Sequence, residues 1–251
     1  MLLLTAGAVV VLVASLLGGV TGFGVGLVCA PLLLLLGVPL TDVVIVNLTI
    51  GLVTRAASVA RLHRSVHRRR AMDLVTGCVP GVLIGFLVRG LVSGDALKVT
   101  AGAVAVLVAG YLLLRPTAPD AEAGDAARVP RLATGAAGVL GGFLGITTSL
   151  NGPPPVVLLT RLNVAPRQFV ADLAVYFVVC NGLALLLLGL AGDVEPGRVG
   201  LLLACWLPCA LLGNLLGNSW AARVPRGAFR VLTLGLVLVS GLVTVVTALA
   251  G

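Results

Sequence analysis

Apolar residues in this chain are gathered into long runs, and charged residues, proline and glycine are concentrated in the breaks between them. Ten runs can be delimited, five on each side of one polar segment. A helix needs about 20 mainly apolar residues to cross the hydrocarbon core of a bilayer, and the third, fourth and fifth runs of each half are long enough. In chain order the runs cover approximately residues 2–17, 21–36, 42–60, 72–92, 96–114, 132–148, 153–162, 169–190, 199–219 and 227–250.

The first two runs of each half are shorter than a membrane span. Residues 153–162 would reach only about 15 Å as a helix, against a hydrocarbon core of about 30 Å. Non-helical backbone at membrane depth must be shielded by protein or line a cavity. We therefore expect the first two segments of each half to be broken helices or re-entrant hairpins.

One polar linker, residues 115–131, separates the halves and carries three prolines, three acidic residues and three arginines. It divides the chain into a first repeat at 1–114 and a second repeat at 132–251. The repeat is visible as a series of matches that occur in the same order in both halves. These matches are 17–22 with 140–145, Pro31 with Pro154, Pro39 with Pro166, 79–85 with 207–213 and 96–99 with 228–231.

The composition identifies the class of protein. Apolar residues make up 59% of the 251 residues and charged residues only 10%, and the mean hydropathy is +1.16. So few charges cannot cover the surface of a soluble domain. The prediction is an all-α, multi-pass integral membrane protein with the lipid bilayer as its surroundings.

The basic residues predict how the chain is oriented. Fourteen of the 17 lysines and arginines fall on one side when the runs are threaded through a membrane. By the positive-inside rule, loops 55–70, 115–131 and 223–230 are then cytoplasmic, in the inner (plasma) membrane. This bias accounts for the net charge of +8 without nucleic acid as a partner. Equivalent loops of the two halves face opposite sides, which predicts inverted repeats of about five segments each, an organisation typical of secondary transporters.

Two glycine-rich breaks, at residues 18–26 and 141–155, form the candidate binding site. Helix N-termini beside such breaks offer free backbone N–H groups and a positive dipole end, which favour an anion. The alternative is that the glycines only allow close helix packing. We expect neutral donors, because a buried arginine would hold an anion too tightly for release. The candidate substrate-binding residues are Thr21, Gly22, Gly24, Asn47, Thr148, Ser149, Asn151, Gly152 and Asn181.

Asp172 is a candidate coupling residue, because a carboxylate within a membrane segment can carry a proton or a cation. The alternative is an ion pair with Arg161 or Arg167 at the membrane edge. His63 and His67 have the spacing of two metal ligands on one helix face, but no acidic residue completes a site, so no metal is expected. The sequence contains no recognised hydrolytic or nucleotide-binding motif. We expect no enzymatic activity and no cofactor.

The glycine and proline motifs resemble those of the sulfite exporter TauE/SafE family of membrane permeases. Residues 19–26 read Gly-x-x-Gly-Phe-Gly-x-Gly and are followed by Ala-Pro-Leu at 30–32, while residues 151–154 read Asn-Gly-Pro-Pro. Pro80 with Gly85 and Pro208 with Gly213 also resemble the family pattern. The resemblance covers nearly the whole chain and implies movement of sulfite, sulfonates or related small organic anions. Val25 and residues 146–149 stand where many members carry further glycines, so the particular substrate stays open.

The function predicted from these features is a secondary transporter, either permease or exporter, of a small anion driven by an ion gradient. A non-transporting membrane scaffold or assembly factor, using the Arg-rich loop at 55–70 as its partner surface, is one alternative. A cation exporter is the other, and Asp172 is the residue that keeps it open. A homo-oligomer is compatible with either.

Overall fold

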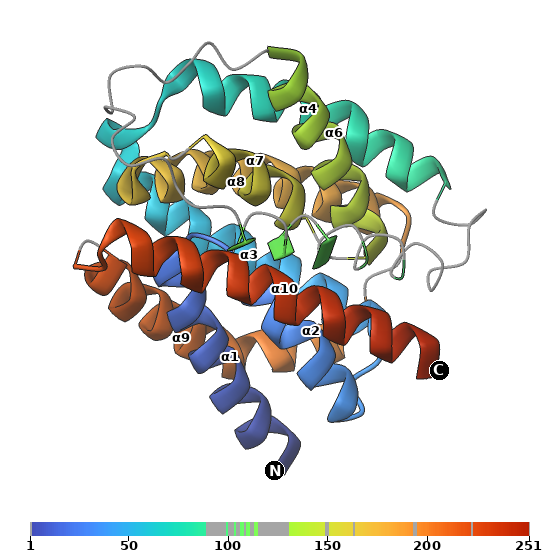
Figure 1. Cartoon of the computed structure of the whole chain (residues 1–251). Helices are drawn as coiled ribbons and strands as arrows, with labels where there is room; N and C mark the ends of the chain where they lie inside the picture. The colour runs from blue at the N-terminus through green and yellow to red at the C-terminus, as the bar shows by residue number, and fades with distance from the viewer. Residues whose placement is uncertain are drawn as a thin grey trace.

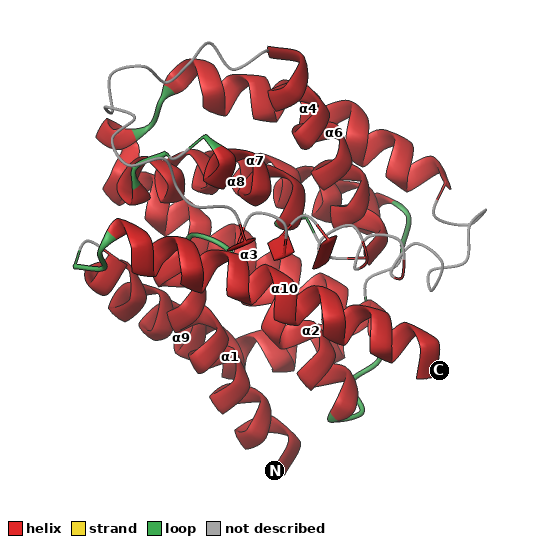
Figure 2. Ribbon diagram, in the orientation of Figure 1, coloured by secondary structure: helices red, strands yellow, loops and turns green. Residues whose placement is uncertain are grey.

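The computed structural model describes residues 2–88, 131–148, 151–162, 164–192, 195–221 and 223–250, and isolated positions between 99 and 114. The described residues form nine α-helices and one short 3-10 helix, with no strand (Figures 1 and 2). The all-α prediction is confirmed. The helices are α1 (Leu2–Thr21), α2 (Val25–Leu35), α3 (Leu40–Leu62), η1 (His63–Ser65), α4 (Arg68–Val88), α6 (Arg131–Thr148), α7 (Pro153–Arg161), α8 (Pro166–Leu190), α9 (Pro196–Ala221) and α10 (Arg226–Ala250).

These helices follow the apolar runs closely, because most runs are bounded by residues that start or stop a helix. Pro39 is the N-cap of α3, and Pro153, Pro166 and Pro196 are the first residues of their helices. Proline suits that position because its missing N–H would have no intrahelical acceptor there. The predicted run at 96–114 lies largely outside the described residues.

The lengths of the helices correct one expectation. α1 has 20 residues and is one of five helices long and apolar enough to cross a membrane, so the prediction of a short first segment is wrong there. The helix continues through Gly18 and Gly19 and ends only at Thr21. The second segments are short, as expected, because α2 has 11 residues and α7 has nine.

Glycines allow two pairs of helices to pack at very short range. α1 lies along α9, and α6 lies along α4. A Cβ atom added to Gly19 would come within 2.6 Å of the Asn214 carbonyl oxygen, and one added to Gly142 within 2.5 Å of the Cys78 carbonyl oxygen. Because a methyl group cannot fit at such distances, these glycines act as packing residues, which is the alternative considered above.

The two helix pairs repeat each other's contacts with a defined register. Gly19 faces the carbonyl oxygen of Asn214 and the amide of Asn218, and Gly142 faces the carbonyl oxygen of Cys78 and the amide of Val82. Cys78 therefore occupies the place in α4 that Asn214 occupies in α9. The sequence match of 79–85 with 207–213 instead pairs each residue of α4 with a residue of α9 that lies about two helical turns from its spatial counterpart. That match was wrong because both helices carry many similarly spaced apolar and small residues.

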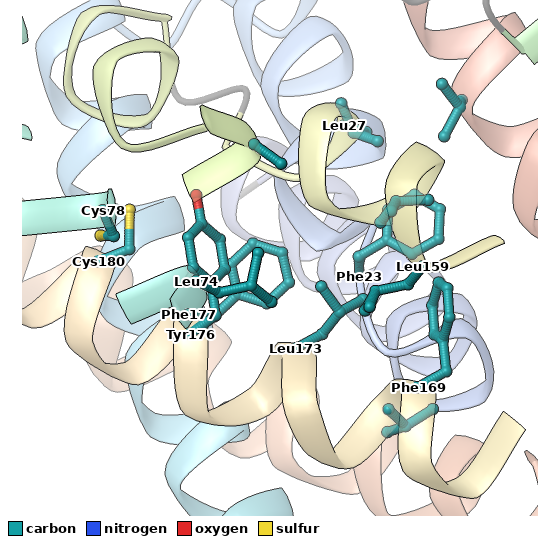
Figure 3. Close-up of a cluster of buried hydrophobic side chains, with 14 of the residues drawn as sticks. Phe23, Leu27, Leu74, Cys78, Leu159, Phe169, Leu173, Tyr176, Phe177 and Cys180 are labelled. Atoms are coloured by element: carbon teal, nitrogen blue, oxygen red, sulfur yellow. The ribbon is translucent and has the colours of Figure 1, made fainter. Parts of the chain in front are cut away.

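α8 runs through the interior of the molecule, beside α3 and α4 (Figure 1). Its residues from Phe169 to Ala174 are all buried, and further along Tyr176 and Phe177 meet edge to face with ring centroids 5.2 Å apart. Figure 3 shows these rings in one apolar cluster with Phe23, from the break before α2. This cluster fixes the position of the 22–24 break against α8.

The packing analysis predicts the effect of a single methyl group. Gly81→Ala would place a Cβ against the backbone carbonyl of Val139 in α6, so we expect destabilisation of about 1–3 kcal/mol and a melting temperature several degrees lower in detergent. The matched control is Gly189→Ala in α8, where nothing lies within 4 Å of the added atom. Equal melting temperatures for the two variants would contradict this account of the α4–α6 contact.

Candidate functional site

A cavity of about 40 Å³ lies where the start of α2, the middle of α3, the break before α7 and the second half of α8 meet. The helix breaks supply backbone to one side of it, and the long helices supply side chains to the other. The residues that line it are Phe23, Gly24, Val25, Gly26, Leu27, Asn47, Leu48, Gly51, Arg55, Asn151, Gly152, Phe177 and Asn181.

Arg55 is the one charged residue among the described residues of this lining, and it is only 2% exposed. Its Nη2 donates a hydrogen bond of 3.2 Å to Asn214 Oδ1, and the Asn214 amide in turn donates to the Thr54 carbonyl at 3.3 Å. A Cβ on Gly18 would lie 3.1 Å from Nη2, so this glycine leaves space for the guanidinium. Arg55 Nη1 is buried and has no hydrogen-bond partner.

Sequence reasoning missed Arg55 because it counted the residue with the basic loop that follows the third run. α3 continues to Leu62, which places Arg55 about two turns inside the helix. The expectation of a site with neutral donors alone is therefore wrong for this cavity. The available signal was the sequence itself, because Arg55 is followed by Ala-Ala-Ser-Val-Ala, which continues the apolar run past it.

Asn47 lies two turns before Arg55 on the same face of α3, with Gly51 between them. Its side chain is 4% exposed, and neither Oδ1 nor Nδ2 has a hydrogen-bond partner. Buried amides are normally hydrogen-bonded, so each exception needs an explanation. Asn47 thus places one unsatisfied donor and one unsatisfied acceptor at the cavity.

Two further asparagines close the opposite wall. Asn151 Nδ2 donates to Asn181 Oδ1 at 2.6 Å, which joins the break before α7 to α8. Tyr176 Oη donates to the Asn151 carbonyl at 3.3 Å. A Cβ on Gly51 would come within 2.5 Å of Asn181 Nδ2, so Gly51 is the position that admits this amide between α3 and α8.

The two short helices contribute unequally to the site. Gly24 is the N-cap of α2 with φ 98°, and the first backbone N–H groups of α2 have no intrahelical acceptor. At α7 the first three residues are prolines, which have no N–H. The expectation that both helix N-termini offer free N–H groups in their first turn is therefore wrong for α7, and α2 is the helix that offers them.

Some of the residues predicted to bind the substrate line this cavity, and others lie elsewhere in the structure. Gly24, Asn47, Asn151, Gly152 and Asn181 line the cavity, whereas Thr21 and Gly22 do not. The Thr21 hydroxyl bonds two backbone carbonyl oxygens of its own segment at 2.8 Å, and Gly22, with φ 82°, packs against Val170. Thr148 is the last residue of α6, but its side chain, like the whole of Ser149, lies outside the described part of the structure.

Asp172 is fully buried but does not line the cavity. It accepts hydrogen bonds from Arg70 Nε at 2.6 Å and from the His67 backbone N–H at 2.8 Å. Its ion-pair partner is Arg70, not Arg161 or Arg167 as the alternative interpretation had it. This pair ties the start of α4 and the turn before it to α8.

The cavity has a clear electrostatic character, since the described residues that line it include a guanidinium and no carboxylate. In the part of the chain that the structure describes, no three His, Cys, Asp or Glu residues are grouped in a way that could hold a metal ion. A small anion is the ligand whose charge this lining complements.

The comparisons with known proteins agree with the fold and the motifs. The model of one protein family, described as "Sulfite exporter TauE/SafE", matches residues 7–244. No curated protein and no solved structure gives a match. Because the match spans nearly the whole chain, the chain belongs to the sulfite exporter TauE/SafE family.

Proposed function

We propose that this protein is a secondary transporter that moves a small anion, such as sulfite, a sulfonate or a related organic anion, across the inner membrane. The cavity between α2, α3 and α8 is the substrate site, and Arg55 is the residue that holds the charge. The family match and the five helices that could span a membrane support this proposal.

The observation that carries the proposal is Arg55 Nη1, a charged donor that is buried, lacks a partner and belongs to a side chain lining the cavity. A buried charge without a partner costs several kcal/mol, and breaking a buried ion pair is costly for the same reason. An anion bound in the cavity would remove this cost. The amide groups of Asn47 and the N-terminus of α2 lie around the same space and would add neutral donors.

The size of the cavity limits the substrate. A cavity needs a volume of roughly 10–15 Å³ to hold one water molecule. A volume of about 40 Å³ therefore suits a group of a few heavy atoms, such as an oxyanion headgroup. A substrate with a long tail would need the cavity to widen.

We also propose that the two halves are inverted repeats that alternate access to the site. The equivalent packing of α1 on α9 and of α6 on α4 supports this arrangement. Asp42 of α3 pairs with Arg198 of α9 at 3.2 Å, so one ion pair joins α3 to α9 as another joins α8 to α4, although at positions that the register of the glycine contacts does not make equivalent. Movement of one repeat against the other would open the cavity to either side.

The orientation of the proposed repeats can be measured directly. In a background without cysteines, a cysteine introduced at position 66 should be protected from an impermeant reagent applied outside, and one at position 194 should react. If both positions react from the same side, the inverted arrangement with a cytoplasmic Arg-rich loop is incorrect.

Removal of the charge at the cavity gives the main functional test. Arg55→Gln should lower anion uptake into liposomes at least tenfold, because it replaces a charge-assisted hydrogen bond with a weaker neutral one. The control is Arg61→Gln, an exposed arginine in the last turn of the same helix. Wild-type uptake by a well-expressed Arg55→Gln variant would contradict the proposed site. No uptake by the wild type, over a panel of sulfite, sulfoacetate, taurine and small carboxylates, would favour the scaffold alternative.

The role of Asp172 can be separated from that of the cavity. We propose that Asp172 holds the turn before α4, so that Asp172→Asn alone should cost about 3–5 kcal/mol by leaving Arg70 buried without its partner. Replacing both residues by leucine should recover much of that stability. A folded double variant that transports but no longer responds to the gradient would instead establish the coupling role predicted from the sequence.

A further inference from the structure

We infer that the site selects a monoanion that still carries a proton, and that Asn47 is the residue that detects this proton. The inference rests on the proposed function, because it concerns the same cavity. It adds a specificity-determining residue and the ionisation state of the substrate.

The argument begins with the two unsatisfied atoms of Asn47. An asparagine amide offers one carbonyl acceptor and one NH₂ donor, and the two ends exchange places when the amide is turned over. In either orientation Asn47 keeps both a donor and an acceptor without a partner. A ligand that satisfies this side chain must therefore accept one hydrogen bond and donate another.

The neighbouring groups do not supply the missing donor. The Arg55 side chain carries only donors, but Nη2 is already given to Asn214, and Nη1 does not reach the Asn47 carbonyl oxygen, because both atoms are without a hydrogen-bond partner. The Asn151 amide is directed to the carbonyl oxygen of Asn181. Asn47 is thus left with an open acceptor in a lining that has the charge of an anion site.

This combination distinguishes two forms of one substrate. A fully deprotonated oxyanion has only acceptor atoms, so it would satisfy Arg55 and leave the carbonyl oxygen of Asn47 buried without a donor. A monoprotonated oxyanion presents an anionic oxygen to Arg55 and its own O–H to Asn47. Leaving a buried acceptor unsatisfied weakens binding by about ten- to a hundredfold.

The consequence concerns how transport is coupled to a gradient. If the bound species is HA⁻, each substrate brings one proton across the membrane and releases it as HA⁻ dissociates to A²⁻ and H⁺ on the more alkaline side. No carboxylate of the protein then has to carry the proton. Among the lining residues that the structure describes there is no carboxylate, which agrees with such a route.

The test compares two anions of similar shape, hydrogen sulfite and methanesulfinate, which differ in that a methyl group replaces the hydroxyl. Binding to the purified full-length protein is measured by calorimetry at a pH below the second pKa of sulfurous acid. The wild type should bind hydrogen sulfite at least tenfold more tightly than methanesulfinate. Asn47→Leu should bring the ratio of the two affinities close to one, while Arg55→Gln should weaken both anions.

Thr49→Val is the matched control, because Thr49 is a polar residue of α3 that bonds the Ile45 carbonyl of its own helix and does not line the cavity. It should keep the wild-type ratio. Equal affinities of the wild type for the two anions, with both still dependent on Arg55, would overturn this inference and leave the proposed function standing. Absence of Arg55-dependent binding for either anion would overturn both.

Discussion

The burial of one guanidinium group among apolar helices is the constraint on which the rest of this structure depends. Arg55 lies on α3, a helix that could span a membrane, and is 2% exposed. A charge in such a place is tolerated only with partners or beside a cavity. The structure meets this need from several elements: Asn214 of α9 accepts a hydrogen bond from Nη2, Gly18 of α1 leaves space, and the cavity lies on the remaining side.

Close packing of the outer helices makes this arrangement possible. Glycines at the α1–α9 and α4–α6 contacts let backbones approach each other, and α3 and α8 lie side by side between these pairs. The short helix α2 then brings its first residues to the cavity, and the break before the short helix α7 brings Asn151 and Gly152. Because Asn214 already holds part of the guanidinium, the proposed anion would share Arg55 with a neutral group. Such sharing suits a transporter, which has to release its substrate.

The sequence predicted the helices well because their signal is local. Long apolar runs bounded by proline and glycine marked α3, α8 and α9 to within a few residues, and the short α2 and α7 were expected from the same pattern. It also predicted that Asn47, Asn151 and Asn181 belong to one site, since polar residues inside apolar helices require partners. The continuity of α1 through Gly18 and Gly19 was not predicted, because glycine tolerates both a break and a close contact and only tertiary packing decides between them.

Arg55 itself shows where sequence reasoning failed in physical terms. Counting basic residues by loop treats every arginine near a helix end as solvated, but a helix that continues by two turns carries its arginine inward. The Asp172–Arg70 pair was missed for a related reason. The two residues are far apart in the chain, and which arginine reaches a buried carboxylate depends on how α4 crosses α8.

The most direct test of the proposed anion site is an experimental structure of the protein determined with sulfite at a concentration that saturates binding. The account predicts an ordered anion in the cavity, within hydrogen-bonding distance of Arg55 Nη1 and of the Asn47 amide. An ordered anion held elsewhere in the protein, with only water or side chains beside Arg55, would contradict it.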